Sequence, residues 1–428
     1  MEQTARVRCC VVGGGPAGMM LGLLLARAGV EVVVLEKHGD FLRDFRGDTI
    51  HPSTLEVMHE LGLLGQFLAL PHQEIRQLRA QVGDVTLPIA DFTHLPVRCP
   101  FVAFMPQWDF LDFLARHASA YSTFRLRLRT EATGLREESG RIVGVEATSP
   151  AGPVQIAADL VVAADGRDSV IRDRARLPVE TLGAPMDVLW FRLPRTSGDP
   201  ANVMGRFDAG RIVVTLNRGD YWQCGFVIPK SSLEAVRAQG LDAFRRQVAQ
   251  LVPYAAGRVD AIRSWDDVKL LTVQVDRLRQ WWRPGLLCIG DAAHAMSPVG
   301  GVGINLAIQD AVAAANRLAV PLAEQRVTTE DLQAVQRRRE LPTRVTQQMQ
   351  IVVQRRVISP VLTTRAPLRP PALLRALAGV PLLRRLPARL IGIGVRPEHV
   401  RSPARPAARP TAAQLASREI HSDQAKGA

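Results

Sequence analysis

A glycine-rich turn between two apolar runs lies near the start of the chain and constrains the fold more than any other feature. Residues 7–12 predict a buried strand, residues 16–27 predict a helix that is apolar nearly all round, and residues 30–35 predict a second buried strand. Gly29 ends the predicted helix. A buried strand, a buried helix and another buried strand are typical of a parallel sheet covered on both faces.

The turn itself, Gly13-x-Gly15-x-x-Gly18, matches the fingerprint of a dinucleotide-binding loop. Gly13 allows a tight turn, Gly15 lets the backbone approach a pyrophosphate, and Gly18 lets helix and strand pack closely. The pyrophosphate then meets free N–H groups at the positive end of the helix, which starts at Pro16 and Ala17. The alternative is a glycine turn without a ligand, and the strand and helix around the turn weigh against it.

An acidic residue ends the second predicted strand. A carboxylate at Glu36 can accept hydrogen bonds from both hydroxyls of a ribose, and it would repel a 2′-phosphate. NAD and FAD pass this test, whereas NADP in this cradle does not. Lys37 follows directly and is included in the predicted site.

Two further stretches place acids at strand ends. Asp165-Gly166 follows the apolar residues 160–164, and Gly290-Asp291 follows the apolar residues 286–289. Both acids are expected at the carboxyl edge of a parallel sheet, where ligands of such folds bind. An isolated Asp-Gly is usually only a turn. Because both stretches occur together with the first glycine turn, binding is the better interpretation.

These three motifs, in this order, resemble the single-component (class A) FAD-dependent aromatic monooxygenases of the para-hydroxybenzoate hydroxylase type. The resemblance covers about the first 320 residues. It implies that Glu36 and the glycine turn hold the adenosine half of FAD. It also implies that the Asp165 stretch lies near the pyrophosphate and contributes to NAD(P)H binding, and that the Gly290 stretch contacts the ribityl chain.

The same resemblance implies flavin contacts elsewhere. Arg46 and Gln107 match positions that touch the flavin, although Trp108 stands where the family often has a basic residue. Backbone N–H groups of a glycine turn that leads into a helix can also stabilise the negative charge of a reduced flavin. The residues predicted for this second turn are Pro298, Gly301, Gly303, Ile304 and Asn305.

The implied function is that of an FAD-dependent hydroxylase. In the family that the chain resembles, NAD(P)H binds transiently and reduces a tightly but non-covalently bound FAD. O2 then forms a flavin C4a-hydroperoxide that hydroxylates an aromatic or polycyclic small molecule. The alternatives are another FAD-dependent oxidoreductase, such as a quinone-pathway hydroxylase, epoxidase or reductase, and a non-catalytic flavin-binding protein. A disulfide reductase is disfavoured, because no second dinucleotide cradle and no redox cysteine pair are present.

The expected architecture is α/β. It combines a Rossmann-like FAD-binding domain of the glutathione-reductase type with an inserted antiparallel β-sheet substrate domain and a C-terminal helical segment. The FAD-binding domain is expected at 1–182, with a substrate-domain excursion near 73–100, and again at 271–365. The other expected parts are the substrate-binding sheet at 183–270, the helical segment at 366–400 and a flexible tail at 401–428.

The substrate is expected between the flavin and that sheet. The aromatic side chains of Tyr221, Trp222 and Phe226 are candidate pocket walls, and His51 is a candidate at the flavin edge. Half of any alternating set faces away from a site, so core packing is the alternative for each aromatic residue. No residue is assigned as a catalytic acid or base.

The composition and charge of the chain indicate which kinds of binding partner to expect. The formal net charge is +13, but no zinc spacing or RNA-binding aromatic motif accompanies it, so nucleic acid is not expected. The five cysteines form no metal-type or redox spacing and suit a reducing cytoplasm. No apolar run is long enough to span a membrane, and packing is preferred over membrane contact for the leucine- and arginine-rich residues 366–395. A soluble, cytoplasmic, metal-free enzyme is predicted, with no prediction of its oligomeric state.

Overall fold

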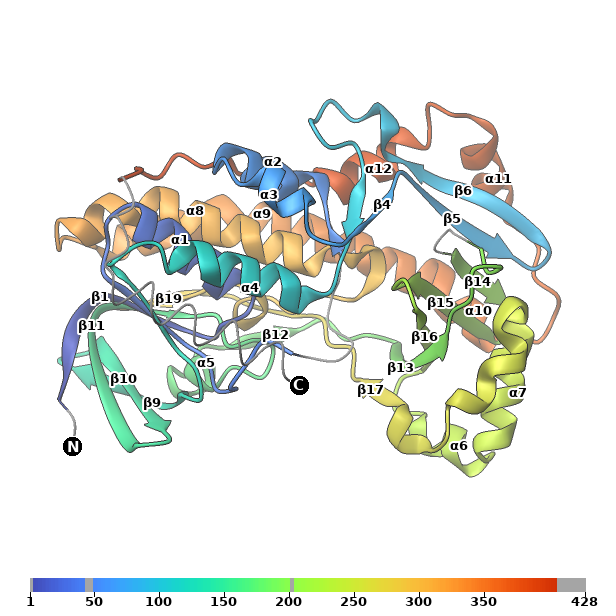
Figure 1. Cartoon of the computed structure of the whole chain (residues 1–428), viewed down its shortest axis with the longest axis horizontal. Helices are drawn as coiled ribbons and strands as arrows, with labels where there is room; N and C mark the ends of the chain where they lie inside the picture. Colours follow the sequence, from blue (N-terminus) through green and yellow to red (C-terminus); the bar gives the residue numbers. More distant parts are fainter. Residues whose placement is uncertain (1–2, 43–48, 201–203, 406–428) are drawn as a thin grey trace.

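A parallel sheet forms the centre of the computed structural model, which describes residues 3–42, 49–200 and 204–405 (Figure 1). The strands lie in the order β8-β2-β1-β11-β20-β19, and all are parallel except the edge strand β19. The buried runs predicted from the sequence supply the central strands. Their bounds are β1 (Gln3–Val12), β2 (Val32–Leu35), β8 (Phe124–Arg127), β11 (Gly152–Ala163), β19 (Trp282–Arg283) and β20 (Leu286–Cys288).

Helices cover one face of this sheet, and an antiparallel extension lies on the other side (Figure 1). The helices are α1 (Pro16–Arg27), α4 (Gln107–Ala118), α8 (Gly303–Ala323) and α9 (Thr329–Val353), and the extension is β9 (Glu131–Glu138) and β10 (Arg141–Ser149). Gly22 lets α1 approach the sheet, because a Cβ there would lie 2.8 Å from the Val34 side chain and 2.9 Å from that of Phe124. The predicted parallel sheet covered on both sides is therefore confirmed.

The segment after β2 contains two short helices, α2 (Pro52–Glu60) and α3 (Leu64–Leu68). The break comes at Gly62, whose φ of +73° is incompatible with a continuing helix. A small sheet of β3 (Thr49–Ile50), β7 (Val102–Phe104) and β4 (Gln73–Ile75) lies beside these helices.

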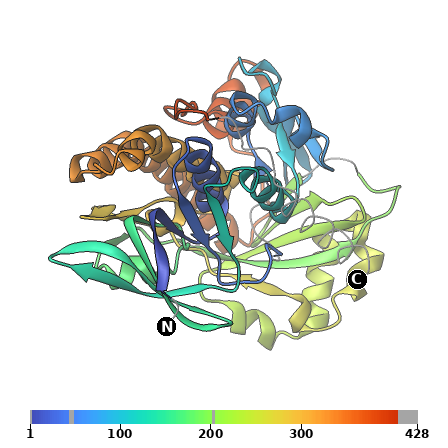
Figure 2. The same cartoon turned by 60° about the vertical axis from the view of Figure 1, so that its left-hand side comes forward.

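A second, largely antiparallel sheet lies beside the first (Figure 2). Its strand order is β17-β13-β16-β15-β14-β5-β6, so residues 77–91 join it from the distant N-terminal part of the chain. The strand bounds are β5 (Gln77–Val82), β6 (Val85–Asp91), β13 (Met186–Pro194), β14 (Met204–Asp208), β15 (Arg211–Asn217), β16 (Tyr221–Pro229) and β17 (Lys269–Leu271).

The two faces of this second sheet are covered by different parts of the chain. The outer face carries α7 (Leu241–Leu251) and η2 (Pro253–Ala261), with α6 (Leu233–Ala238) nearby, and forms its own apolar core with them. The inner face packs against η6 (Gln354–Ile358) and α10 (Ser359–Thr363). The remaining short elements are α5 (Val170–Arg174), β12 (Val179–Thr181), β18 (Asp276–Leu278), η1 (Phe92–His94), η3 (Trp265–Asp267), η4 (Gly290–Ala292) and η5 (Val299–Gly301).

The C-terminal segment packs on the outside of the body. It contains α11 (Ala372–Gly379) and α12 (Arg385–Gly392), and Ala388 of α12 is buried against η1 and β6. Beyond α12 the chain stays attached, because the Arg405 N–H donates to the Arg27 carbonyl at the end of α1 over 2.7 Å. The described chain therefore continues in contact with the body past residue 401, where the flexible tail was expected. Within the three described ranges, no helix combines the length and the apolar character needed to cross a membrane.

Candidate functional site

The glycine turn between β1 and α1 has the geometry that a dinucleotide requires. Gly13 adopts φ +106° beside Ala164, and a Cβ on Gly18 would overlap the carbonyl oxygen of Gly13. Only glycine fits either place. A Cβ on Gly15, by contrast, would meet no heavy atom of the described chain within 4 Å. The turn therefore packs tightly on the sheet side and leaves open space on the ligand side, where a pyrophosphate would lie.

Two helix N-termini adjoin at this rim. Neither α1 nor α8 has a capping side chain from the described residues. Ala17, in the first turn of α1, and Ala307, in the second turn of α8, both lie beside Gly290, where a Cβ would be 3.1 Å and 3.2 Å from their side chains. Uncapped amides and two helix dipoles favour negative charge at this point. The arrangement suits a pyrophosphate at α1 and an anionic ring at α8.

The predicted ribose acid lies beside the turn. Glu36 is half-buried, and its Oε2 accepts from the Gly14 N–H over 3.0 Å while Oε1 accepts from the His38 N–H over 3.0 Å. The carboxylate is thus held at the end of β2, close to the glycine turn, where a ribose can reach it. Lys37 is exposed at the same edge.

Asp165 lies next to the turn but uses its carboxylate locally. Ser169 Oγ and the Ile171 N–H both donate to it, which orders the loop before α5. Burial raises the pKa of Asp165, although these hydrogen bonds oppose the rise. Gly166 follows with φ +93°. The predicted strand-end acid is therefore adjacent to the cofactor turn, and in this structure it shapes the loop that Gly166 leads into.

The Gly290-Asp291 stretch reaches the same rim from β20. Gly290 adopts φ +59°, and its N–H donates to Oδ2 of Asp310 over 3.1 Å. Asp291 is half-buried, with one oxygen 3.8 Å from the guanidinium of Arg167. The ends of β1, β11 and β20, which are neighbours in the sheet, therefore bring the three motifs together.

A buried ionic cluster holds Gly290 in place. Asp310 is fully buried and accepts from Nε2 of His294 over 2.6 Å and from Nε of Arg339 over 2.9 Å. Burial raises the pKa of Asp310, but His294 and Arg339 more than offset this and bring it below its usual value. Arg339 Nη1 also lies 3.5 Å from Glu398. A negative carboxylate is thus balanced inside the protein and fixes the turn.

The second glycine turn is tied to the strand β3. Asn305 Oδ1 accepts from the His51 N–H over 2.8 Å, and the Thr49 Oγ1–H donates to the Gly301 carbonyl over 2.8 Å. His51 is buried, and its Nδ1 donates to the Ile391 carbonyl over 2.7 Å. Burial lowers the pKa of His51 to about 4 despite that bond, so the ring is neutral at pH 7. His51 was predicted as a residue at the flavin edge of the substrate site and Asn305 as a flavin-binding residue, and the structure joins them by a hydrogen bond.

The other predicted flavin contacts fall around this turn. Pro298, Gly301, Gly303 and Ile304 are all half-buried and so remain accessible at the rim. Gln107 begins α4 and is half-buried. Arg46 lies outside the described residues. Both glycine turns, the Glu36 carboxylate and the open space at Gly15 together fit FAD, whose two halves would lie along these strand ends. When bound, FAD supplies the electron transfer from NAD(P)H and the activation of O2.

The aromatic residues predicted to line the substrate site divide between the two faces of the second sheet. Trp222 and Phe226 point to the outer face, where they are buried in the core beneath α7. Trp222 Nε1 donates there to Asp199 over 2.7 Å. Tyr221 has the opposite phase and lies under the guanidinium of Arg192 at 4.9 Å. Trp222 and Phe226 are therefore core residues, because alternate side chains of a strand point to opposite faces.

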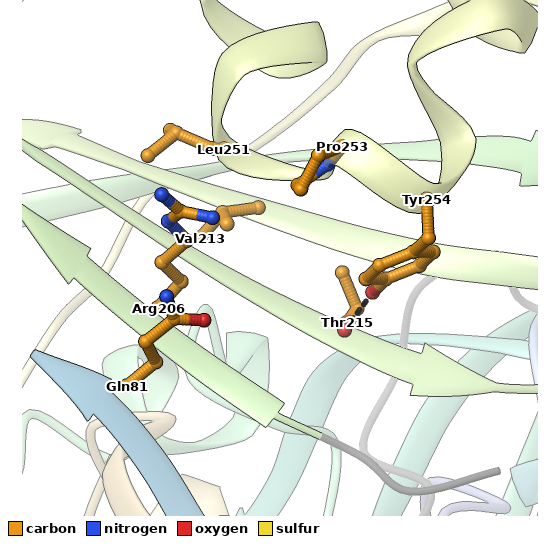
Figure 3. A pocket seen from close by; sticks show the side chains of 7 residues that line it. All are labelled: Gln81, Arg206, Val213, Thr215, Leu251, Pro253 and Tyr254. Atoms are coloured by element: carbon orange, nitrogen blue, oxygen red, sulfur yellow. Dashed lines mark hydrogen bonds between the residues drawn. The ribbon is translucent and has the colours of Figure 1, made fainter. Parts of the chain in front are cut away.

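A shallow hollow of about 300 Å³ also lies on the outer face (Figure 3). In it, Tyr254 donates to Thr215 over 2.9 Å, and Arg206 lies beside Val213. Val213 belongs to the core beneath α7. This hollow is thus separated from the cofactor rim by the sheet itself. The lining residues are Gln81, Arg206, Val213, Thr215, Leu251, Pro253 and Tyr254.

Sequence reasoning missed two residues that shape the rim. Asp310 anchors Gly290, and Thr49 anchors Gly301. A charged residue in the nearly all-apolar pattern of residues 304–319 was a usable signal for Asp310, since an unpaired charge is not buried there. Thr49 carried no signal, because its role depends on β3 lying beside a turn about 250 residues away.

Known proteins resemble the chain over most of its length. Residues 6–349 match the family described as an FAD binding domain. 6-Methylpretetramide 4-monooxygenase of Streptomyces rimosus is 33% identical over 357 residues, which cover 83% of this chain and 85% of that protein. Rifampicin monooxygenase of Streptomyces venezuelae is 31% identical over 316 residues, 70% of this chain and 61% of that longer protein.

Solved structures share the fold. PqsL of Pseudomonas aeruginosa superposes with a TM-score of 0.70 at 21% identity, covering 84% of this chain and 100% of that one. The OxyS anhydrotetracycline hydroxylase of Streptomyces rimosus also has a TM-score of 0.70 at 21% identity, covering 91% of this chain and 76% of that one. Together with the family match and the rim that fits FAD, these likenesses confirm the expected family. The chain belongs to the class A FAD-dependent aromatic monooxygenases, and it is an FAD-dependent oxidoreductase that uses NAD(P)H.

Proposed function

We propose that the protein hydroxylates a fused-ring aromatic small molecule, with FAD held at the rim and with NAD(P)H and O2 as co-substrates. The observation that carries the proposal is the contact between the second sheet and the second glycine turn. Val299, within that turn, packs against the apolar cluster that includes the inner-face residues Val188, Ile212 and Val227. A substrate on this face would therefore lie beside the ring end of FAD.

The chain's own residues would position and shield the reactants. We propose that the adenosine half rests on the glycine turn and Glu36, and that the ring end rests on the second glycine turn, with Asn305 and Thr49 holding that turn. The inner face is apolar and lies under η6 and α10. Such surroundings exclude water, which protects a reactive oxygen species from wasteful breakdown.

The names of the relatives favour polycyclic substrates. The relative at 33% identity is named for 6-methylpretetramide, and others are named for rifampicin and anhydrotetracycline. A para-nitrophenol 4-monooxygenase of Pseudomonas, at 24% identity, represents single-ring substrates. The higher identity and the fuller coverage of the first relative support a fused-ring substrate for this chain.

Substrate-dependent oxygen use tests the proposal. Purified holoenzyme is supplied with NADH or NADPH and a panel of phenols, quinones and aromatic polyketides, and NAD(P)H and O2 consumption are followed. The expected result is stimulation by fused-ring aromatics, with one atom from ¹⁸O2 in the product. Flavin reduction without oxygen uptake would instead indicate a reductase, and an unreactive yellow protein would indicate a flavin-binding protein.

We further propose a cytoplasmic enzyme built of two functional parts. All five cysteines lie in described parts of the chain and are buried and free, which suits a reducing compartment. The FAD-binding part would comprise 1–182 and 271–365, and the substrate part 183–270 with the excursion near 73–100. Fractionation of the producing cells tests the location, because recovery of the enzyme outside the cytoplasm would contradict it.

A further inference from the structure

The register of the second sheet shows which side chains share its inner face. Val188, Ile212 and Val227 mark that face, because they belong to the apolar cluster against which Val299 of the second glycine turn packs. Cross-strand partners point to the same side of a sheet, and so do residues two apart along a strand. The strand pairing therefore identifies the other residues whose side chains lie on the inner face.

One row across this face contains three small residues among its five positions. Trp190 of β13 is paired with Gly225 of β16, and Gly225 with Val214 of β15. Val214 is paired in turn with Gly205 of β14, and Gly205 with Ala80 of β5. Two glycines and an alanine in five successive strands are unusual, because glycine weakens a strand interior and commonly marks a place where something else approaches closely.

Aromatic rings occupy the space that the two glycines leave. A Cβ on Gly225 would lie 3.0 Å from two carbons in the six-membered ring of Trp190. A Cβ on Gly205 would lie 3.3 Å from the ring of Phe207. Both residues are half-buried and pack against the apolar cluster of Val188, Ile212 and Val227, so their rings cover this part of the sheet. We call Trp190, Gly225, Val214, Gly205 and Phe207 the aromatic floor.

The rows on either side give the aromatic floor its borders. On one side, Val188, Val227 and Ile212 pack under Val299 and α10. On the other side, Gln223 is paired with Leu216, and Leu216 packs with the apolar cluster around Phe92, Phe104 and Ile391. Gln223 is 5% exposed, and its Oε1 accepts from Arg218 Nε over 3.1 Å. The aromatic floor is thus an apolar strip with a buried amide at its edge.

We propose that the aromatic floor binds the ring system of the substrate and selects a planar, fused-ring molecule over a single ring. This inference rests on the proposed function and names the surface that would determine substrate size. Neighbouring strands are about 4.8 Å apart, so the three steps from Gly225 to Ala80 span about 14 Å. That length exceeds one aromatic ring and matches a row of fused rings. Stacking of rings on Trp190 and Phe207 would supply the contact.

Ligand binding to the holoenzyme tests the inference independently of turnover. Dissociation constants for alizarin, a three-ring probe, and 4-nitrophenol, a one-ring probe, are measured from the change in flavin absorbance. The test variants are Gly225→Val and Gly205→Val, which lift Trp190 or Phe207 from the sheet. Thr86→Val is the matched control, because Thr86 is exposed and paired with the outer-face residue Gln81. Valine is a good strand former, which favours retention of the fold.

The expected result is a specific loss of the larger ligand. Both glycine variants should bind alizarin about tenfold or more weakly, a loss of about 1.4 kcal/mol or more. They should change 4-nitrophenol binding by less than about threefold, and the control should match the wild type for both probes. The FAD content of all variants should stay the same. Trp190→Ala provides a second test should a glycine variant not fold, and it should also weaken alizarin binding.

Several results would overturn the inference. These are wild-type affinity for alizarin in the glycine variants and in Trp190→Ala, equal loss of both probes, or no binding of alizarin by the wild type. The outcome is distinguishable from failure of the proposed function. If alizarin binds selectively but does not stimulate O2 uptake, the proposed hydroxylation is wrong and the role of the aromatic floor stands. If alizarin stimulates O2 uptake equally in the wild type and the variants, the hydroxylation stands and the role of the aromatic floor is wrong.

Discussion

The rim at which we propose that FAD binds and the sheet that faces it are built on different principles. At the rim, backbone geometry decides: Gly13 and Gly18 have no space for a side chain, and adjoining strand ends bring the motifs together. In the second sheet, the strand register determines which face each side chain occupies. Trp222 and Tyr221 are neighbours in sequence, yet they point to opposite faces. Local residue patterns therefore encode the rim, whereas pairing between distant strands encodes the face of the second sheet.

The largest effect is expected at the rim. Gly18→Ala places a Cβ against the Gly13 carbonyl oxygen, and relieving that overlap must separate α1 from β1. We expect a loss of about 3 kcal/mol or more of stability and purification without FAD. The ratio of flavin to protein absorbance and a thermal melt measure both. Gly65→Ala is the control, because a Cβ at Gly65 meets nothing within 4 Å. A yellow, stable Gly18→Ala protein would show that the turn is not packed as described.

Next in size is the buried ionic cluster behind the rim. Asp310→Asn removes the negative charge that balances Arg339 and weakens the hold on Gly290. Breaking a buried pair on one side costs about 3–5 kcal/mol. FAD affinity should fall as well, measured by titrating the apoprotein. Glu340→Gln is the matched control, since it breaks an exposed pair with Arg344 and should cost less than about 1 kcal/mol. Equal effects of the two substitutions would contradict this assignment.

A pH effect should follow from His51, which joins the rim to α12. Its pKa is about 4 in the folded protein, below the ordinary value of 6.5, so the unfolded chain takes up the proton first. The stabilisation is complete above pH 6.5 and is lost as the pH falls toward 4, by up to about 3 kcal/mol. The free energy of unfolding is measured in urea at pH 7.5, 6 and 5 for the wild type and for His51→Gln, whose side chain does not titrate in this range. Parallel pH dependence in the two proteins would refute a neutral buried histidine.

The smallest effect is expected on the outer face of the second sheet. Trp222→Phe removes the bond to Asp199 and should lower stability by about 1–3 kcal/mol. Because Trp222 points away from the rim, affinity for an aromatic ligand and the rate of NAD(P)H consumption should not change. Flavin-absorbance titration and steady-state assays check both. A raised Kd or KM in this variant would place the substrate on the outer face and reverse the comparison between the two faces.

The sequence predicted the rim well because each part has a local cause. The Gly13 turn, Glu36 and the strand ends before Asp165 and Gly290 follow from apolar runs and glycine spacing, and the structure brings them together. The substrate side was less accessible. The phase of Trp222 and Phe226 depends on which face α7 covers, and the Gly225–Val214–Gly205 row depends on strand pairing. Neither the orientation of the two aromatic side chains nor the glycine row can be predicted from one segment of the chain alone.

Some hydrogen bonds in the folded chain could not be predicted from local sequence patterns. Asp165 remains a predicted cofactor-binding residue, and the structure adds that Ser169 and Ile171 donate to its carboxylate. Arg405 falls in the segment predicted as a flexible tail, and its backbone N–H donates to the end of α1. Neither set of hydrogen bonds could be predicted from the sequence around the residue alone.

A structure of the holoenzyme with a bound fused-ring aromatic would show where both ligands lie. The expected arrangement places FAD along the ends of β1, β11 and β20, with the ligand on Trp190 and Phe207 beside the Pro298–Gly301 turn. A ligand bound instead among Trp222 and Phe226, or in the outer hollow at Tyr254, would contradict it.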